Sequence, residues 1–110
     1  VKDALHTIPE IDVHKVKNKL DTGEDFYLVD VREESERQQG KISGSIYLGK
    51  GIIERDIEST IPNKNQKIVL YCQGGFRSAL AAQSLKNMGY NNVISMSGGF
   101  GEWANNYPIS

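Results

Sequence analysis

Residues 67–89 read KIVLYCQGGFRSALAAQSLKNMG, and this stretch decides the fold class. Its first six residues are mostly apolar, which is typical of a strand that is buried on both faces of a parallel sheet. Residues 77–89 are rich in Ala and Leu and end at a glycine, which predicts a helix. The apolar face of that helix is predicted to consist of Leu80, Ala81, Leu85 and Met88. A strand, a Gly-Gly turn and a helix in succession predict a βα unit with Cys72 as the last strand residue.

Other segments alternate in the same way along the chain. FYLVDV at 26–31 is a second strong candidate for a buried strand, and SIYL at 45–48 and NVISM at 92–96 are weaker ones. Helical patterns lie between the strands, over residues 13–20, 33–40, 51–60 and 98–106. This alternation predicts an α/β domain with a mostly parallel sheet, and ligands of such sheets bind at the carboxyl ends of the strands. Cys72 is therefore expected at the ligand-binding edge.

Composition narrows the class of protein. The chain has 110 residues, 38% hydrophobic and 25% charged, which suits one globular domain. The net charge of −1 argues against nucleic-acid or anionic-membrane binding, and no apolar run reaches the ~20 residues needed to cross a bilayer.

One cysteine forms no internal disulfide, which favours the reducing cytoplasm. The first ten residues lack an initiator Met, which leaves open a processed form whose signal peptide was removed. His6 and His14 are far from Cys72, so no metal-ligand spacing occurs.

The segment from Cys72 to Ser78 combines several features of an anion-binding loop. Gly74 and Gly75 are predicted to take positive φ and to curl the backbone so that its N–H groups converge at a helix start. Such a cradle stabilises a thiolate on Cys72, and Arg77 adds a positive charge. Each feature alone is more typical of an inert core cysteine beside a turn. Together they favour a nucleophile, since an arginine opposes the dipole at a helix N-terminus unless an anion is bound nearby.

Three segments together resemble the rhodanese (sulfurtransferase) domain family. YLVDVREESERQQGKISGSIYL at 27–48 is similar to the family's strand with Asp-Val-Arg and the helix and turn that follow it. VLYCQGGFRSALAAQSLKNMGY at 69–90 is similar to its Cys-x4-Arg loop and helix, and NVISMSGGFGEW at 92–103 to its closing Gly-Gly-aromatic-x-x-Trp motif. The resemblance covers about residues 11–109. It implies that residues 1–110 form one domain, with a central sheet of about five strands between two layers of helices.

The resemblance also implies a reaction. Cys72 would attack the outer sulfur of a small anionic donor such as thiosulfate, and a thiol or protein acceptor would then take this sulfur from the Cys72 persulfide. The loop residues would hold the persulfide and the donor, and they are Gln73, Gly74, Gly75, Phe76, Arg77 and Ser78. Phe76 is expected to pack beneath the loop or to line its entrance. No metal or cofactor is implied.

Two other classes of function stay open. One is a phosphatase or an arsenate-reductase-like enzyme; related phosphatases of this fold use a Cys-x5-Arg loop, whereas four residues separate Cys72 from Arg77. The shorter loop favours a single sulfur atom over a phosphate group. A non-catalytic interaction module with the same fold is the other alternative, and an intact nucleophile argues against it.

Some residues outside the loop are expected to be structural. Asp30 and Arg32 flank the end of a buried strand, and we expect an ion pair there because a buried charge needs a partner. The aromatic side chains of Phe100, Trp103 and Tyr107 are expected to close the core under the last helix. Lys41 stands where the family often has histidine, Ser43 where it often has proline, and Arg37 where it often has an aromatic residue. We interpret Lys41 as a solvated surface residue.

Overall fold

Five parallel strands form one sheet in the computed structural model, which describes residues 8–49 and 51–110. The strand order is β1-β5-β4-β2-β3, and all four pairings are parallel. The strands are β1 (Glu10–Ile11), β2 (Tyr27–Asp30), β3 (Ile46–Tyr47), β4 (Ile68–Tyr71) and β5 (Val93–Met96). The predicted α/β class with a parallel sheet is confirmed. Strand β1, a two-residue edge strand paired with β5, was not among the predicted elements.

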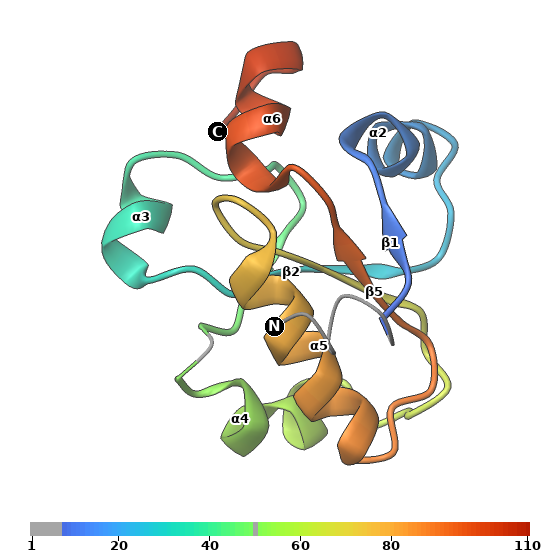
Figure 1. Ribbon diagram of the computed structural model, residues 1–110. Coiled ribbons are helices and arrows are strands. Elements are labelled where there is room, and N and C mark those ends of the chain that lie inside the picture. The colour runs from blue at the N-terminus through green and yellow to red at the C-terminus, as the bar shows by residue number, and fades with distance from the viewer. Residues whose placement is uncertain (1–7, 50) are drawn as a thin grey trace.

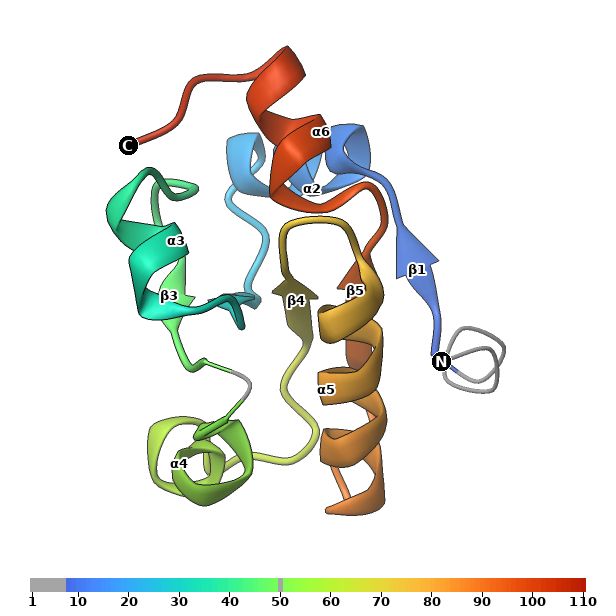
Figure 2. The ribbon, with the colours of Figure 1, turned by 60° about the vertical axis from the view of Figure 1, so that its left-hand side comes forward.

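Helices connect the strands and cover both faces of the sheet (Figures 1 and 2). They are α2 (Val13–Asp21), α3 (Glu34–Gln38), α4 (Ile53–Thr60), α5 (Phe76–Asn87) and α6 (Gly99–Asn106). Helices α4 and α5 pack on one face, and α2 and α6 pack on the other. The short helix α3 follows β2 and lies close to the start of α5 (Figure 1).

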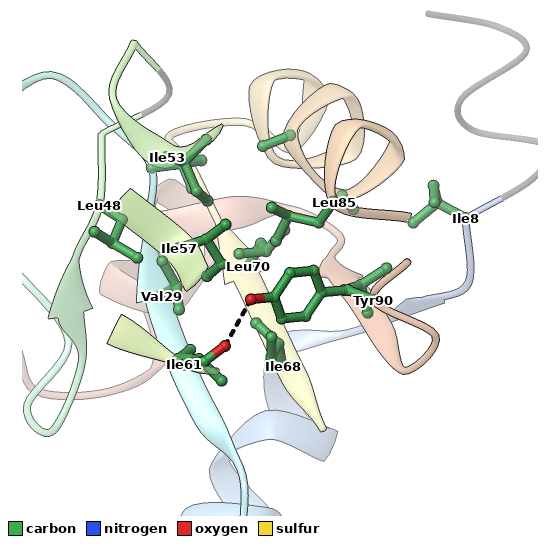
Figure 3. Close-up of a cluster of buried hydrophobic side chains, with 14 of the residues drawn as sticks. Ile8, Val29, Leu48, Ile53, Ile57, Ile61, Ile68, Leu70, Leu85 and Tyr90 are labelled. Atoms are coloured by element: carbon green, nitrogen blue, oxygen red, sulfur yellow. Dashed lines mark hydrogen bonds between the residues drawn. The ribbon is translucent and has the colours of Figure 1, made fainter. Parts of the chain in front are cut away.

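The first core cluster fills the space between the sheet and the pair α4 and α5 (Figure 3). Val29 of β2 and Leu70 of β4 meet Ile57 of α4 and Leu85 of α5 there, and all four are buried. At the edge of this cluster, the hydroxyl of Tyr90 donates to the carbonyl of Ile61 at 2.6 Å, as Figure 3 shows. This bond satisfies the one polar atom that the tyrosine brings into an apolar environment.

The second core cluster lies on the opposite face, under α2 and α6. Because side chains alternate along a strand, Val69 and Tyr71 point to this face while Leu70 points to the other. Tyr71 stacks against Phe100, with ring centroids 6.4 Å apart. Trp103 is buried beside them, and the predicted packing of the C-terminal aromatic residues is confirmed. Burial on both faces explains why β2 and β4 are continuous apolar runs.

The best helix of the sequence differs in detail from its prediction. Helix α5 begins at Phe76, one residue before the predicted start, and Gly75 is its N-cap. Leu80, predicted to lie on the apolar face, is only half-buried, whereas Ala82 is fully buried. Small alanine side chains let α5 approach the sheet closely, so the face toward the core is set by Ala81, Ala82 and Leu85.

Candidate active site

The sulfur of Cys72 lies at the carboxyl end of β4, beneath the loop that leads into α5. Only 1% of the residue is exposed. The Sγ atom accepts a hydrogen bond from the N–H of Gly75 at 3.0 Å and lies 3.6 Å from Oγ of Ser78. Both groups come from the first turn of α5, where free backbone N–H groups and the helix dipole favour a negative charge. The Gly75 N–H therefore suits a sulfur that carries negative charge, whereas the Ser78 oxygen accepts from the S–H of a neutral thiol.

The two glycines of the loop have different conformations. Gly75 has φ +109° and is buried, whereas the φ of Gly74 is not positive. A Cβ at Gly74 would have no heavy atom of the described residues within 4 Å. The prediction of positive φ is thus right for Gly75 and wrong for Gly74. The single left-handed residue is enough to turn the Gly75 N–H toward the sulfur.

A pair of buried serines lies behind the sulfur. Ser78 Oγ donates to the carbonyl of Gly75 at 3.1 Å and lies 2.8 Å from Oγ of Ser95 in β5. Each hydroxyl has one proton, so the Ser95 hydroxyl donates to Ser78 while Ser78 donates to Gly75. Ser95 was not singled out in the sequence, although a serine inside the apolar segment 92–96 is the signal that could have found it.

Helix α6 fixes the first residues of the loop through its own N-terminus. The N–H of Phe100 donates to the carbonyl of Cys72 at 2.8 Å, and the N–H of Gly101 donates to the carbonyl of Gln73 at 3.1 Å. A Cβ at Gly99 would lie 2.6 Å from the Cys72 oxygen and 2.5 Å from the Gln73 oxygen, and its φ is +60°. Only glycine permits this approach. The Gly-Gly turn before α6 therefore supports the loop as well as starting a helix.

The guanidinium of Arg77 is held by Glu36 of α3. Its Nη1 and Nη2 atoms donate to the two carboxylate oxygens at 2.6 and 2.8 Å. The hydrogen bonds from Arg77 lower the pKa of Glu36 to about 2, and the same contact raises the pKa of Arg77. The sequence predicted a cation here but not its partner, because 41 residues separate the two.

A small pocket marks the mouth of the loop. Its volume is about 230 Å³, and it is lined by Glu10, Gly74, Gly75, Phe76, Ser97 and Gly98. Phe76 is 59% exposed and lines this pocket, so it does not pack beneath the loop. Gln73 and Gly74 are also exposed. The pocket is bounded mainly by glycine backbone, which allows a small molecule to come close to the loop.

Comparison with known proteins assigns the family. Residues 12–106 match the family described as the rhodanese-like domain. The chain belongs to this family. A sulfurtransferase of Allochromatium vinosum is 36% identical over 97 residues, which are 88% of this chain and 89% of that protein. The putative sulfur carrier protein YrkF of Bacillus subtilis is 33% identical over 97 residues, and the match spans 88% of this chain but 51% of YrkF.

Solved structures share the fold of this chain. A Rhodopseudomonas palustris protein of unknown function, RPA3614, described as a possible tyrosine phosphatase, has a TM-score of 0.92 and 32% identity over 99% of this chain and 89% of its own. The human single-domain sulfurtransferase TSTD1 has a TM-score of 0.79 over 91% of this chain and 98% of its own. Its identity of 22% supports the fold alone. The relatives named sulfurtransferases support a rhodanese type of sulfur transfer.

In this rhodanese-like domain, Asp30 and Arg32 form the buried pair that the sequence predicted. Arg32 Nε and Nη2 lie 3.0 and 2.9 Å from the two oxygens of Asp30, and Nη2 also donates to the carbonyl of Gly40 at 2.6 Å. Arg37 Nη1 and the Tyr71 hydroxyl donate to the same carboxylate, at 3.0 and 3.1 Å. The network fixes the chain after β2, from which α3 starts.

Lys41 is half-buried, and its backbone pairs with that of Ser110. Within residues 8–49 and 51–110, no group of His, Cys, Asp and Glu side chains could hold a metal ion. In the same ranges, no helix is long and apolar enough to cross a membrane.

Proposed function

We propose that this protein is a sulfurtransferase that carries sulfur as a persulfide on Cys72. The observation that carries the proposal is the hydrogen bond from the Gly75 N–H to the Cys72 sulfur, inside a Cys-x4-Arg loop at the carboxyl edge of the sheet. A preformed N–H donor stabilises negative charge on that sulfur without further reorganisation. The relatives named sulfurtransferases support the same reaction class.

The first step transfers the outer sulfur of a small anionic donor such as thiosulfate. The Cys72 thiolate attacks that sulfur, a new S–S bond forms, and the donor's S–S bond breaks. The bonding electron pair leaves with sulfite, so no external oxidant is needed. The product is Cys72–S–S⁻, whose terminal sulfur takes over the negative charge.

The second step returns the enzyme to its starting state. An acceptor thiolate attacks the terminal sulfur and leaves as a persulfide, and Cys72 becomes a thiolate again. The acceptor must come from outside the chain, because Cys72 is its only cysteine. We propose a small thiol or a protein thiol as acceptor, and residues 1–110 as one domain that works in the cytoplasm.

The likeness to RPA3614 makes a phosphatase the second candidate. Two features favour sulfur transfer over it. Four residues, not five, lie between Cys72 and Arg77. In addition, Glu36 compensates the charge of Arg77, which weakens the attraction of that guanidinium for a doubly charged phosphate group.

Intact-mass spectrometry after incubation with thiosulfate tests the proposal. The wild type is expected to gain about 32 Da, one sulfur atom, and Cys72→Ala is expected to gain nothing. Addition of cyanide or a thiol should remove the added mass. Absence of the adduct, or an equal adduct on Cys72→Ala, refutes sulfur transfer. Cys72-dependent hydrolysis of an aryl phosphate would favour the phosphatase, and inactivity in both assays would favour an interaction module.

A further inference from the structure

The arginine that was expected to bind an anionic donor is already bound to a carboxylate. Glu36 engages Arg77 through both of its oxygens, and the two side chains are 30% and 35% exposed. The guanidinium has five N–H groups, and two of them bind Glu36, so three are left to bind a molecule that donates sulfur. Its charge, however, is compensated. A donor at this loop meets a neutral ion pair instead of a free cation.

Glu36 is fixed from a second direction as well. Its Oε1 atom accepts the N–H of Glu33 at 3.0 Å, which completes the capping box at the start of α3. A donor that displaced the carboxylate from Arg77 would therefore also disturb the cap of α3. Glu33 and Glu34 lie in the same turn and are exposed, whereas Arg32 and Arg37 of the same segment are paired with Asp30. These contacts keep the charge of Arg77 compensated in the first turn of α5, directly after the loop that holds Cys72.

We propose that Glu36 sets donor specificity by disfavouring doubly charged sulfur donors. Singly charged donors, such as small organic persulfides and thiosulfonates, would then be preferred over thiosulfate. The carboxylate of Glu36 repels a donor with two negative charges about twice as strongly as a donor with one. This inference rests on the proposed sulfur transfer and adds to it the charge class of the donor. Glu36 acts through Arg77 and need not touch the reacting sulfur.

Glu36→Gln is the variant that isolates the charge. Glutamine at this position retains the capping box and can still accept a hydrogen bond from Arg77, so α3 stays in place. A unit charge a few ångströms away, in surroundings between protein and water, changes binding by roughly three- to tenfold per donor charge. Glu34→Gln removes the same charge from an exposed position in the same turn and serves as the matched control.

The experiment compares two donors that transfer the same kind of sulfur. Thiosulfate carries two negative charges and methanethiosulfonate one, and both leave a persulfide on Cys72. The rate of persulfide formation is followed by intact mass at low salt, where surface charges are least screened. Glu36→Gln is expected to raise the ratio of kcat/KM for thiosulfate to that for methanethiosulfonate by roughly three- to tenfold, and Glu34→Gln by much less.

Alkylation of Cys72 compares a more charged reagent with a less charged one in the same way, but without sulfur transfer. Iodoacetate carries one negative charge and iodoacetamide none, and Glu36→Gln is expected to raise the ratio of their rates. Unchanged ratios in both assays, or an equal rise in Glu34→Gln, overturn the specificity role and leave Glu36 as a structural clasp. If neither donor loads the wild type, the proposed function fails, and the alkylation ratio still decides whether Glu36 controls the charge at this site.

Discussion

Replacement of Gly75 by alanine should damage the active-site loop through backbone strain alone. Gly75 has φ +109° and ψ −14°, a conformation that alanine rarely adopts. Space is not the obstacle, because a Cβ would lie 3.8 Å from the nitrogen of Gly98 and 3.9 Å from the carbonyl oxygen of Met96. These are ordinary contact distances. The cost of the substitution is therefore the cost of the dihedral angle.

That cost can be estimated from the conformation. A non-glycine residue held in a sparsely populated region costs about 1–3 kcal/mol. The alanine also restricts the unfolded chain, which offsets about 0.4–1 kcal/mol of this. We expect a net loss of about 1–2 kcal/mol in the free energy of unfolding, after these two values are combined. If the loop relaxes to negative φ instead, the Gly75 N–H turns away from the sulfur and activity falls.

Urea unfolding, followed by the fluorescence of the single tryptophan, Trp103, measures the loss. Gly74→Ala is the matched control, since its φ is not positive and its Cβ would be free of contacts. It should leave the free energy of unfolding within about 0.5 kcal/mol of the wild type. Persulfide formation with thiosulfate should be slowed more in Gly75→Ala than in Gly74→Ala. Equal effects of the two substitutions on stability and on rate would refute the strain argument.

Two other perturbations test the supports of the loop. Gly99→Ala places a Cβ within 2.6 Å of the Cys72 and Gln73 carbonyl oxygens, and it should lower the free energy of unfolding, measured in urea, by about 2 kcal/mol or more. Gly101→Ala is the control: the nearest contact of its Cβ is at 3.4 Å, and its effect on the free energy of unfolding should be close to zero. The pKa of Glu36, lowered from 4.5 to about 2, means that its pairing with Arg77 stabilises the fold above pH 4.5 and loses this effect as pH falls through 2. The difference in free energy of unfolding between the wild type and Glu36→Gln should therefore shrink in acid, and a difference that stays constant down to pH 2 would contradict it.

Strong local patterns predicted the fold well. Residues 28–31 and 68–72 of the two apolar runs are buried on both faces, so each run carries its signal in a few adjacent residues. Strand β1 has two residues and is defined only by its pairing with β5, which no local pattern encodes. The burial of Ala82 in place of Leu80 has a similar origin, because the packing of α5 against the sheet decides which side of the helix is covered.

The site was predicted as far as it lies within one segment. Cys72, Gly75 and Ser78 meet because they belong to one loop and one helical turn, and their spacing indicates this directly. Which of two adjacent glycines takes positive φ depends on how α6 holds the loop, so Gly74 was assigned wrongly. Glu36 and Ser95 contact the site from distant parts of the chain, so the sequence of the loop alone does not predict them.

Residues of the loop and residues from distant parts of the chain have different roles at the site. In the proposed sulfur transfer, the loop supplies the nucleophile and the N–H donor, and these determine which atom is carried. Helix α6 clamps the carbonyls of Cys72 and Gln73, so the Gly75 N–H is in place before a ligand binds. Glu36 changes neither the sulfur nor its hydrogen bonds, and it acts on the charge that a donor meets. Two proteins with the same Cys-x4-Arg loop can therefore differ in their sulfur donor through a residue that lies on another helix.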